Sequence, residues 1–433
     1  MLKKTAEESN QIFPGWLAII GGLVAVVCHG TTSYAGSYIL SIMILDEGLH
    51  STTAGYCASI ISLCSVLFAT PLGVIFSKRG HRFGLLLGVL SAAVGFAVLA
   101  LMPASDILVI IMYFFLGLAI VVSCKVGVPS LVNRWFQHTR EFPVSLVLAG
   151  GSMGGVFTGL ISGVMSQSGW RGGWVFMFVF NLITLAAILL LVRDNVHELG
   201  EVRDGRRWRE KHGYTMDDSD APVQRTGSKG YSDKKPENGS LMTNPRFILF
   251  SIACLFRMGI YAGCVGYVTL IIVSKGYARE EAVLAVGSLA VASMVGRLTG
   301  PIWIRVLRLS NLNTNRIAHI IAGVGGLIVF FSDSLTMLGF SITLIGFAYG
   351  VGYVAQTLVL SDLFPNAEYS TVFGTFTTIV NFSFLFPSII GLLGAAIGDY
   401  SPIYLVFGLI NFAFALLLSL CKQKHDGTVS VNT

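Results

Sequence analysis

The chain has 433 residues, of which 54% are hydrophobic and only 12% are charged. About a quarter of the residues of a soluble domain are charged, so this composition excludes a soluble protein and indicates one that crosses the membrane many times. In such a protein the basic residues behind the net charge of +6 lie in loops at the membrane surface. There they indicate the orientation of the chain in the membrane, and they do not indicate nucleic-acid binding.

The apolar stretches predict an all-α protein with twelve transmembrane helices, because each is close to the about 20 residues that cross a bilayer. The first stretch is too long for the apolar core of a signal peptide, so we expect it to stay as the first helix. The first six helices are predicted at 16–40, 53–76, 82–102, 107–133, 143–166 and 172–192. The other six are predicted at 247–273, 281–304, 316–332, 335–360, 371–397 and 402–420.

A polar segment at 193–246 separates the two sets of six helices. Its mixed charges, with Gly, Ser and Pro, cannot bury enough apolar surface to fold alone, so we expect a flexible cytoplasmic linker. The predicted domains are a tail at 1–15, a six-helix bundle at 16–192, this linker, a second bundle at 247–420 and a tail at 421–433.

Basic residues are distributed unequally between alternate loops. The termini and the even-to-odd loops hold most of the Lys and Arg, whereas the opposite side holds only Arg171, Lys275 and Arg279. The positive-inside rule therefore predicts that both termini are cytoplasmic, in a multi-pass protein of the plasma or cytoplasmic membrane.

Four polar residues lie deep in predicted membrane helices: His29, Lys125, Arg257 and Arg297. Counted along the helices, they lie about 12 to 20 Å from the cytoplasmic ends. A cation at this depth is costly and usually faces a protein interior or a watery cavity. The cores of the predicted helices offer no carboxylate, so the expected counter-ion is an anionic substrate. The alternatives are bonds to backbone carbonyls and snorkelling of the long side chains to an interface.

Residues 73–82 read GVIFSKRGHR after the second predicted helix. In spacing this loop resembles the G-x-x-x-D-R-x-G-R-R signature of the major facilitator superfamily, with Ser77 in place of the Asp. The resemblance implies two six-helix bundles that alternate access to a central site. A basic cytoplasmic turn is the alternative. The resemblance assigns conformational roles to Gly73, Lys78, Gly80 and Arg82.

The segments 133–136, 148–155, 168–171 and 296–301 resemble the monocarboxylate and oxalate/formate transporters of that superfamily. This resemblance implies that Arg297 binds the substrate carboxylate, and a planar guanidinium suits that role because it offers two parallel donors. It also implies that helices 1, 4, 7 and 10 line the cavity, which would place His29, Lys125 and Arg257 there. We expect further cavity walls, with core packing as the alternative for each, from Tyr34, Tyr261, Tyr349, Tyr353 and Gln356.

The chain departs from those relatives where they carry other charges. Ser293 stands one turn before Arg297, where the relatives have an Asp, and Tyr34 stands near their first-helix Lys. The eleventh-helix Lys of the oxalate antiporter falls near Val380 and Asn381. Lys125 is therefore our best candidate for the second cation.

Glycines recur at four-residue spacing in the fifth predicted helix, at Gly151, Gly155, Gly159 and Gly163. Such stripes let membrane helices approach closely. With Gly300 of the eighth helix they predict either a seam on which the bundles rock or ordinary static packing.

The sequence contains no Walker-type phosphate loop and no catalytic triad, paired carboxylates or metal-ligand cluster at usable spacing. We therefore expect neither an enzyme nor a cofactor. The prediction is a monomeric secondary transporter for a mono- or dicarboxylate, coupled to a proton or a counter-anion or acting as a uniporter. The alternatives are an exporter of drugs or other hydrophobic compounds and a transporter-like sensor that signals through the linker.

Overall fold

The computed structural model describes residues 13–136, 139, 141–194, 196, 201–212, 241–305, 307, 309–364 and 369–421. Within these ranges the chain is all-helical and contains no strand. Eleven helical stretches are long and apolar enough to cross a membrane. The longest of them, Leu146–Leu191, accounts for two crossings because Gly169 interrupts it with φ 65° and ψ −171°. The all-α prediction of twelve membrane helices is thus confirmed.

The N-terminal bundle contains six crossings, two of which are assembled from shorter helical pieces. Their bounds are α2 (Pro14–Glu47), α3 (Thr52–Arg79), α4 (His81–Leu101), α5 (Asp106–Ile120) continued by η2 (Val121–Gly127) and α6 (Val128–Trp135), and α7 (Glu141–Met153) continued by η3 (Gly154–Val156) and α8 (Phe157–Leu191).

The C-terminal bundle repeats this plan after the short helices α9 (Arg206–His212) and η5 (Leu241–Thr243). Its helices are α10 (Pro245–Ser274), α11 (Glu281–Arg305), α12 (Asn311–Phe331), α13 (Leu335–Leu363), α14 (Tyr369–Asn381), η6 (Phe382–Leu385), α15 (Phe386–Ile397), α16 (Ser401–Leu417) and η7 (Leu418–Cys421). Among its described residues the predicted linker therefore includes two short helices, α9 and η5. Its residues 195, 197–200 and 213–240 lie outside the described residues, as do 1–12 and 422–433 of the predicted tails.

Several of these helices begin where the sequence supplies an acceptor for the first free N–H groups. Asn244 accepts hydrogen bonds from the N–H groups of Arg246 (3.0 Å) and Phe247 (3.3 Å) at the start of α10. Ser310 and Ser334 cap α12 and α13 in the same way. These caps fix the helix starts at the membrane surface, close to the predicted boundaries.

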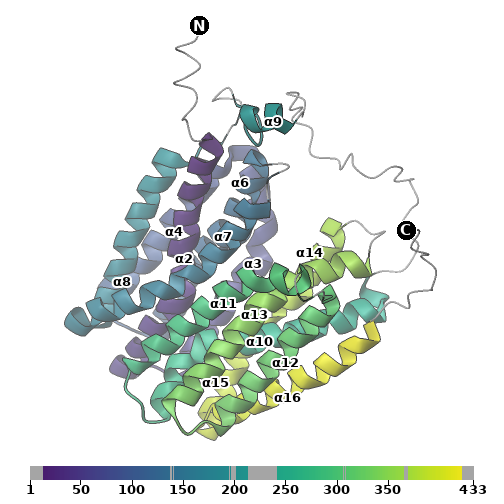
Figure 1. The fold of residues 1–433 in the computed structure, drawn as a ribbon. Helices are drawn as coiled ribbons and strands as arrows, with labels where there is room; N and C mark the ends of the chain where they lie inside the picture. Colours follow the sequence, from purple (N-terminus) through teal and green to yellow (C-terminus); the bar gives the residue numbers. More distant parts are fainter. Residues whose placement is uncertain are drawn as a thin grey trace.

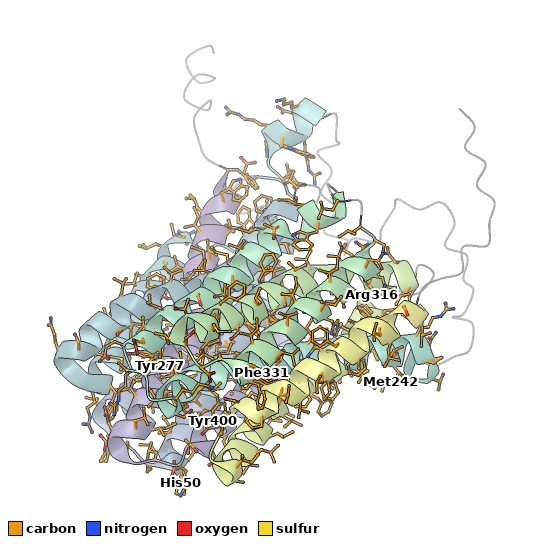
Figure 2. All side chains as sticks on the ribbon, turned by 60° about the horizontal axis from the view of Figure 1, so that its bottom comes forward. His50, Met242, Tyr277, Arg316, Phe331 and Tyr400 are labelled. Carbon is orange, nitrogen blue, oxygen red and sulfur yellow. The ribbon has the colours of Figure 1, made fainter. Side chains whose placement is uncertain are left out.

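The two bundles lie side by side and diverge toward the end of the molecule that carries α9 (Figure 1). They meet at the opposite end, where Asp46 of α2 forms an ion pair with Arg279 before α11. Figure 2 shows His50, Tyr277 and Tyr400 at this closed end, and Met242 and Arg316 at the other. Further contacts join Ser51 to Tyr267, Ser59 to Ser388 and Gly55 to Pro387.

The predicted loop at residues 73–82 is mostly helical, because α3 continues to Arg79 and α4 begins at His81, with only Gly80 between them. Asp194 fastens this turn to the end of the sixth crossing. One carboxylate oxygen of Asp194 accepts hydrogen bonds from the N–H groups of His81 (2.5 Å) and Arg82 (2.9 Å) at the start of α4. Gly80 has φ 85°, and a Cβ there would lie 2.5 Å from the same carboxylate. The Arg82 guanidinium also donates to the Leu189 carbonyl at 2.6 Å. Asp194 thus brings a carboxylate to a loop that has Ser at position 77, and the sequence motif did not point to it.

The remaining motif residues have looser surroundings. A Cβ at Gly73 would meet nothing within 4 Å, and Lys78 is exposed. Among the described residues, neither Gly73 nor Lys78 has a contact that fixes this turn, so their roles stay predictions.

The glycines of the stripe on the fifth helix, and Gly300 on the eighth, have different neighbours. A Cβ at Gly155 would lie 2.0 Å from the Ala290 Cβ of the other bundle, so this glycine permits close contact between the bundles. Gly151 packs against Gly30 of α2, and Gly300 packs against Val354 of α13, each within its own bundle. A Cβ at Gly159 would meet nothing within 4 Å. The stripe is therefore not one seam, because among these glycines only Gly155 contacts the other bundle so closely.

We expect Gly155→Val to destabilise the closed contact with Ala290 by about 1–3 kcal/mol, because the added side chain overpacks a tight interface. The variant should lower the melting temperature of the purified protein. Gly159→Val is the matched control and should leave it nearly unchanged. Equal melting temperatures for the two variants would contradict the assignment of Gly155 to the bundle interface.

Candidate functional site

A cavity of about 170 Å³ lies between the bundles near the middle of the membrane helices. It is lined by helices of both bundles, and an apolar cavity of about 150 Å³ already holds benzene. The space therefore suits a small molecule. Six residues singled out from the sequence line it, namely Tyr34, Lys125, Tyr261, Arg297, Tyr349 and Tyr353.

Arg297 reaches from α11 across to the N-terminal bundle, where its Nη1 donates a hydrogen bond to the Leu148 carbonyl of α7. Its guanidinium carbon lies 5.3 Å from the ring centroid of Tyr349 and 5.1 Å from that of Tyr353. Both contacts are within the range of cation–π attraction. The Arg297 Nε is buried and has no hydrogen-bond partner among the described residues. The charge is thus held by a carbonyl and two aromatic rings.

The tyrosines form a connected group around this arginine. The Tyr261 ring is stacked on that of Tyr349, with centroids 3.6 Å apart and an angle of 3° between the planes. The Tyr261 hydroxyl is hydrogen-bonded to that of Tyr34, which belongs to the N-terminal bundle. Stacking and hydrogen bonding together fix the orientation of the rings, so the aromatic wall is rigid on the Arg297 side of the cavity.

Lys125 is exposed to the cavity from a π-helical segment, η2, in the fourth crossing. Pro129 explains the segment, because a proline ring clashes with the carbonyl four residues earlier, here that of Lys125. The Val128 N–H accordingly bonds to the Ser123 carbonyl five residues back. The wider turn lets both Cys124 and Lys125 line the cavity, and π-segments are frequent at functional sites.

His29 is not among the cavity-lining residues and lies inside the N-terminal bundle, fully buried. The Asn181 amide nitrogen donates to the Val89 carbonyl at 2.9 Å, so its oxygen faces His29 Nε2 at 3.1 Å as an acceptor. His29 Nε2 must then carry the proton, and Nδ1 accepts from the Ser123 hydroxyl at 2.6 Å. This arrangement supports a neutral, structural histidine.

Arg257 and Gln356 also lie outside the cavity lining and bind each other inside the C-terminal bundle. The Arg257 Nη2 donates to the Gln356 side-chain oxygen at 2.7 Å, and Nη1 donates to the Tyr349 carbonyl at 3.4 Å. A Cβ at Gly352 would lie 2.2 Å from Arg257 Nη1, so the glycine provides the space for this side chain. Arg257 therefore supports the helix that carries Tyr349.

The structure adds polar residues that the sequence reasoning did not select. Ser152 of α7 faces Ser293 of α11 across the bundle interface, with hydroxyl oxygens 3.3 Å apart. Single serines are too common in membrane helices to be recognised from one sequence. A larger group faces the cavity from α2 and α3, namely Ser33, Ser37, Ser62 and Ser65.

The cavity is positively charged, because Lys125 and Arg297 line it and no carboxylate of the described residues does. Among the same residues, no group of three or more His, Cys, Asp or Glu side chains is placed to hold a metal ion. The site thus presents two cationic side chains and several hydroxyl groups to a ligand.

Comparison with known proteins identifies a family. Residues 22–387 match the model of the Major Facilitator Superfamily, whereas no curated protein matches the chain. Among solved structures, an inward-facing and occupied bacterial homolog of the human lysosomal transporter Spinster is 13% identical, with a TM-score of 0.68 over 96% of this chain and 98% of that one.

Two other structures agree with this fold. A D-xylose-proton symporter is 14% identical, with a TM-score of 0.67 over 96% of this chain and 99% of its own. The nucleoside transporter NupG is 12% identical, with a TM-score of 0.69 over 95% of this chain and all (100%) of its own. At these identities the likeness concerns the fold and not the cargo.

We expect His29→Leu to destabilise the protein while leaving the cavity intact. The substitution leaves the Asn181 oxygen and the Ser123 hydroxyl buried without their partner, at a cost of about 1–3 kcal/mol for each group. The melting temperature of the purified protein should fall. An unchanged melting temperature, together with weaker binding of a transported compound, would instead place His29 in the binding site.

Proposed function

Because the chain belongs to the Major Facilitator Superfamily, whose members move small molecules through membranes by alternating access, we propose that its cargo is a small organic anion, a mono- or dicarboxylate. The observation that carries this proposal is the charge of the cavity. Lys125 and Arg297 line it, and the described lining residues include no Asp or Glu.

The proposed negative charge of the cargo follows from the free-energy cost of placing a charged group inside a membrane protein. A cation inside a membrane protein requires compensation, and an anionic cargo would bring an opposite charge to the Arg297 guanidinium. A neutral sugar or nucleoside, the cargo type in the titles of two similar structures, would bring no opposite charge to the Arg297 guanidinium. A cationic drug would be repelled. The cavity therefore favours an anion over both alternatives.

We further propose that the cargo carboxylate replaces the Leu148 carbonyl at Arg297. A carboxylate binds a guanidinium best through two parallel N–H groups, but in this conformation Nη1 is bonded to Leu148 and Nε is buried. An ionised oxygen is a stronger acceptor than a carbonyl, so the anion would win the competition. Binding would then break a hydrogen bond that joins the two bundles, which links cargo binding to their movement.

Two other hydrogen bonds between the bundles lie near Arg297 and would change when the bundles move. The Tyr34–Tyr261 and Ser152–Ser293 pairs also connect the N-terminal to the C-terminal bundle. All are neutral hydroxyl contacts, which are weaker than ion pairs in such surroundings. Weak contacts beside the cavity and an ion pair at the closed end suit a protein whose bundles must rock about the cargo.

We place the end that carries α9 in the cytoplasm, following the distribution of basic residues, which makes this conformation inward-facing. The cavity offers no carboxylate among its described residues as a proton carrier. Exchange of anions or uniport needs no such group, so we propose one of these for a monomeric protein of the plasma or cytoplasmic membrane.

Arg297→Lys tests the role of the guanidinium. Lysine keeps the charge but loses the paired donors, and charge-assisted hydrogen bonds contribute about 1.5–3 kcal/mol each. Uptake of radiolabelled carboxylates into proteoliposomes should therefore fall by at least about tenfold. The matched control is Arg246→Lys, at the exposed start of α10, which should transport normally. Undiminished uptake by a folded Arg297→Lys protein would rule out the carboxylate clamp.

A further inference from the structure

We infer that the cargo carries hydroxyl groups in addition to its carboxylate, an inference that rests on the proposed function. The feature behind it is a strip of four serines, Ser33 and Ser37 on α2 and Ser62 and Ser65 on α3, that lines the cavity. Ser33 and Ser37 are four residues apart, and Ser62 and Ser65 are three apart, so each pair shares one helix face. All four belong to the N-terminal bundle, whereas Arg297 belongs to the other.

The serine hydroxyls have lone pairs to offer a ligand. The Ser37 hydroxyl donates its hydrogen to the Ser33 carbonyl at 2.8 Å, and the Ser62 and Ser65 hydroxyls point to the Ala58 and Ile61 carbonyls at 3.3 and 3.4 Å. A hydroxyl that donates backward in this way still accepts from the cavity side. The two longer bonds are also beyond the usual O–H···O distance of about 2.5–3.0 Å, so those hydrogens can turn to a ligand oxygen.

Only some chemical groups match such a strip. A second carboxylate could accept from Ser62 and Ser65, but it has no hydrogen to donate to Ser37, whose own hydrogen is bonded to the Ser33 carbonyl. An alkyl chain neither donates nor accepts. An ammonium group could donate, but Lys125 on the same side of the cavity repels it. A hydroxyl group both donates and accepts without charge. A molecule that spans the cavity with its carboxylate at Arg297 therefore best presents hydroxyl groups to the serines.

Serines that bond to the preceding turn also occur simply as small packing residues in membrane helices. Ser41 is such a case on α2, because its hydroxyl donates to the Ser37 carbonyl at 2.8 Å and its side chain is buried away from the cavity. Ser41 has the same local bond as Ser37 and a shorter one than Ser62 and Ser65, and unlike all of them it does not line the cavity. Ser41 is therefore the matched control for the serines of the cavity.

Propionate, lactate and glycerate test the inference, because these three-carbon monocarboxylates carry no, one and two hydroxyl groups. Each has few enough atoms for a cavity of about 170 Å³. One added neutral hydrogen bond corresponds to about a twofold to tenfold change in affinity. In calorimetric titrations of the full-length protein, we expect glycerate to bind more tightly than lactate, and lactate more tightly than propionate.

Serine-to-alanine variants test whether the strip causes the preference for hydroxylated acids. Ser62→Ala and Ser65→Ala should weaken glycerate binding by about twofold to tenfold and leave propionate binding unchanged, because only the hydroxyl contacts are lost. Ser41→Ala should alter neither. Glycerol serves as the neutral comparison, with the hydroxyl groups but no carboxylate.

Each outcome decides something different. Equal affinity for the three acids, or equal loss of all three in the serine variants, would overturn the hydroxyl inference and leave the anion proposal standing. Glycerol binding as tightly as glycerate would overturn the anion proposal while supporting recognition of hydroxyl groups. Failure of all four compounds to bind would overturn both.

Discussion

The structure depends on how a guanidinium is kept at the depth of the hydrocarbon core. Arg297 is held there by the Leu148 carbonyl and by the faces of Tyr349 and Tyr353. Carbonyl dipoles and aromatic faces lower the cost of the charge without neutralising it. The site therefore retains attraction for an anion, which an Asp at position 293 would have reduced. Ser293 occupies that position and bonds to Ser152 instead.

Under the proposed function, the same arginine would also relate cargo binding in the cavity to the movement of the bundles. Its partner Leu148 lies in the N-terminal bundle, close along the chain to the tight contact between Gly155 and Ala290. Packed interfaces switch between discrete arrangements and do not deform continuously, so a change at Arg297 can be passed on to the whole interface. The ion pair of Asp46 with Arg279 closes the far end, and the bundles diverge toward α9 (Figure 1).

The sequence predicted the helices well because hydrophobic length is a strong signal in membrane proteins. It predicted the depth of the polar residues but not their direction around each helix. His29 precedes the cavity-lining Gly30 by one residue, which is a rotation of about 100°, and so it faces Asn181 instead. Arg257 turns into the space left by Gly352, a contact between residues far apart in the sequence.

Other features of the site also required the structure. The π-segment depends on Pro129, and a proline in a membrane helix more often predicts a simple kink. Asp194 supplies the carboxylate at the loop of residues 73–82 from more than a hundred residues away in the chain. Gly159 continues the glycine stripe in sequence, but a Cβ there would meet nothing within 4 Å, so it does not continue the contact with the other bundle.

We propose that this cavity recognises negative charge through Arg297 and Lys125. The most direct measurement compares lactate with lactamide, which differ only in the replacement of a carboxylate by a neutral amide, in calorimetric titrations of the purified protein. Loss of a charge-assisted contact predicts that lactate binds at least about tenfold more tightly. Equal affinities, or tighter binding of lactamide, would show that the cavity does not recognise negative charge.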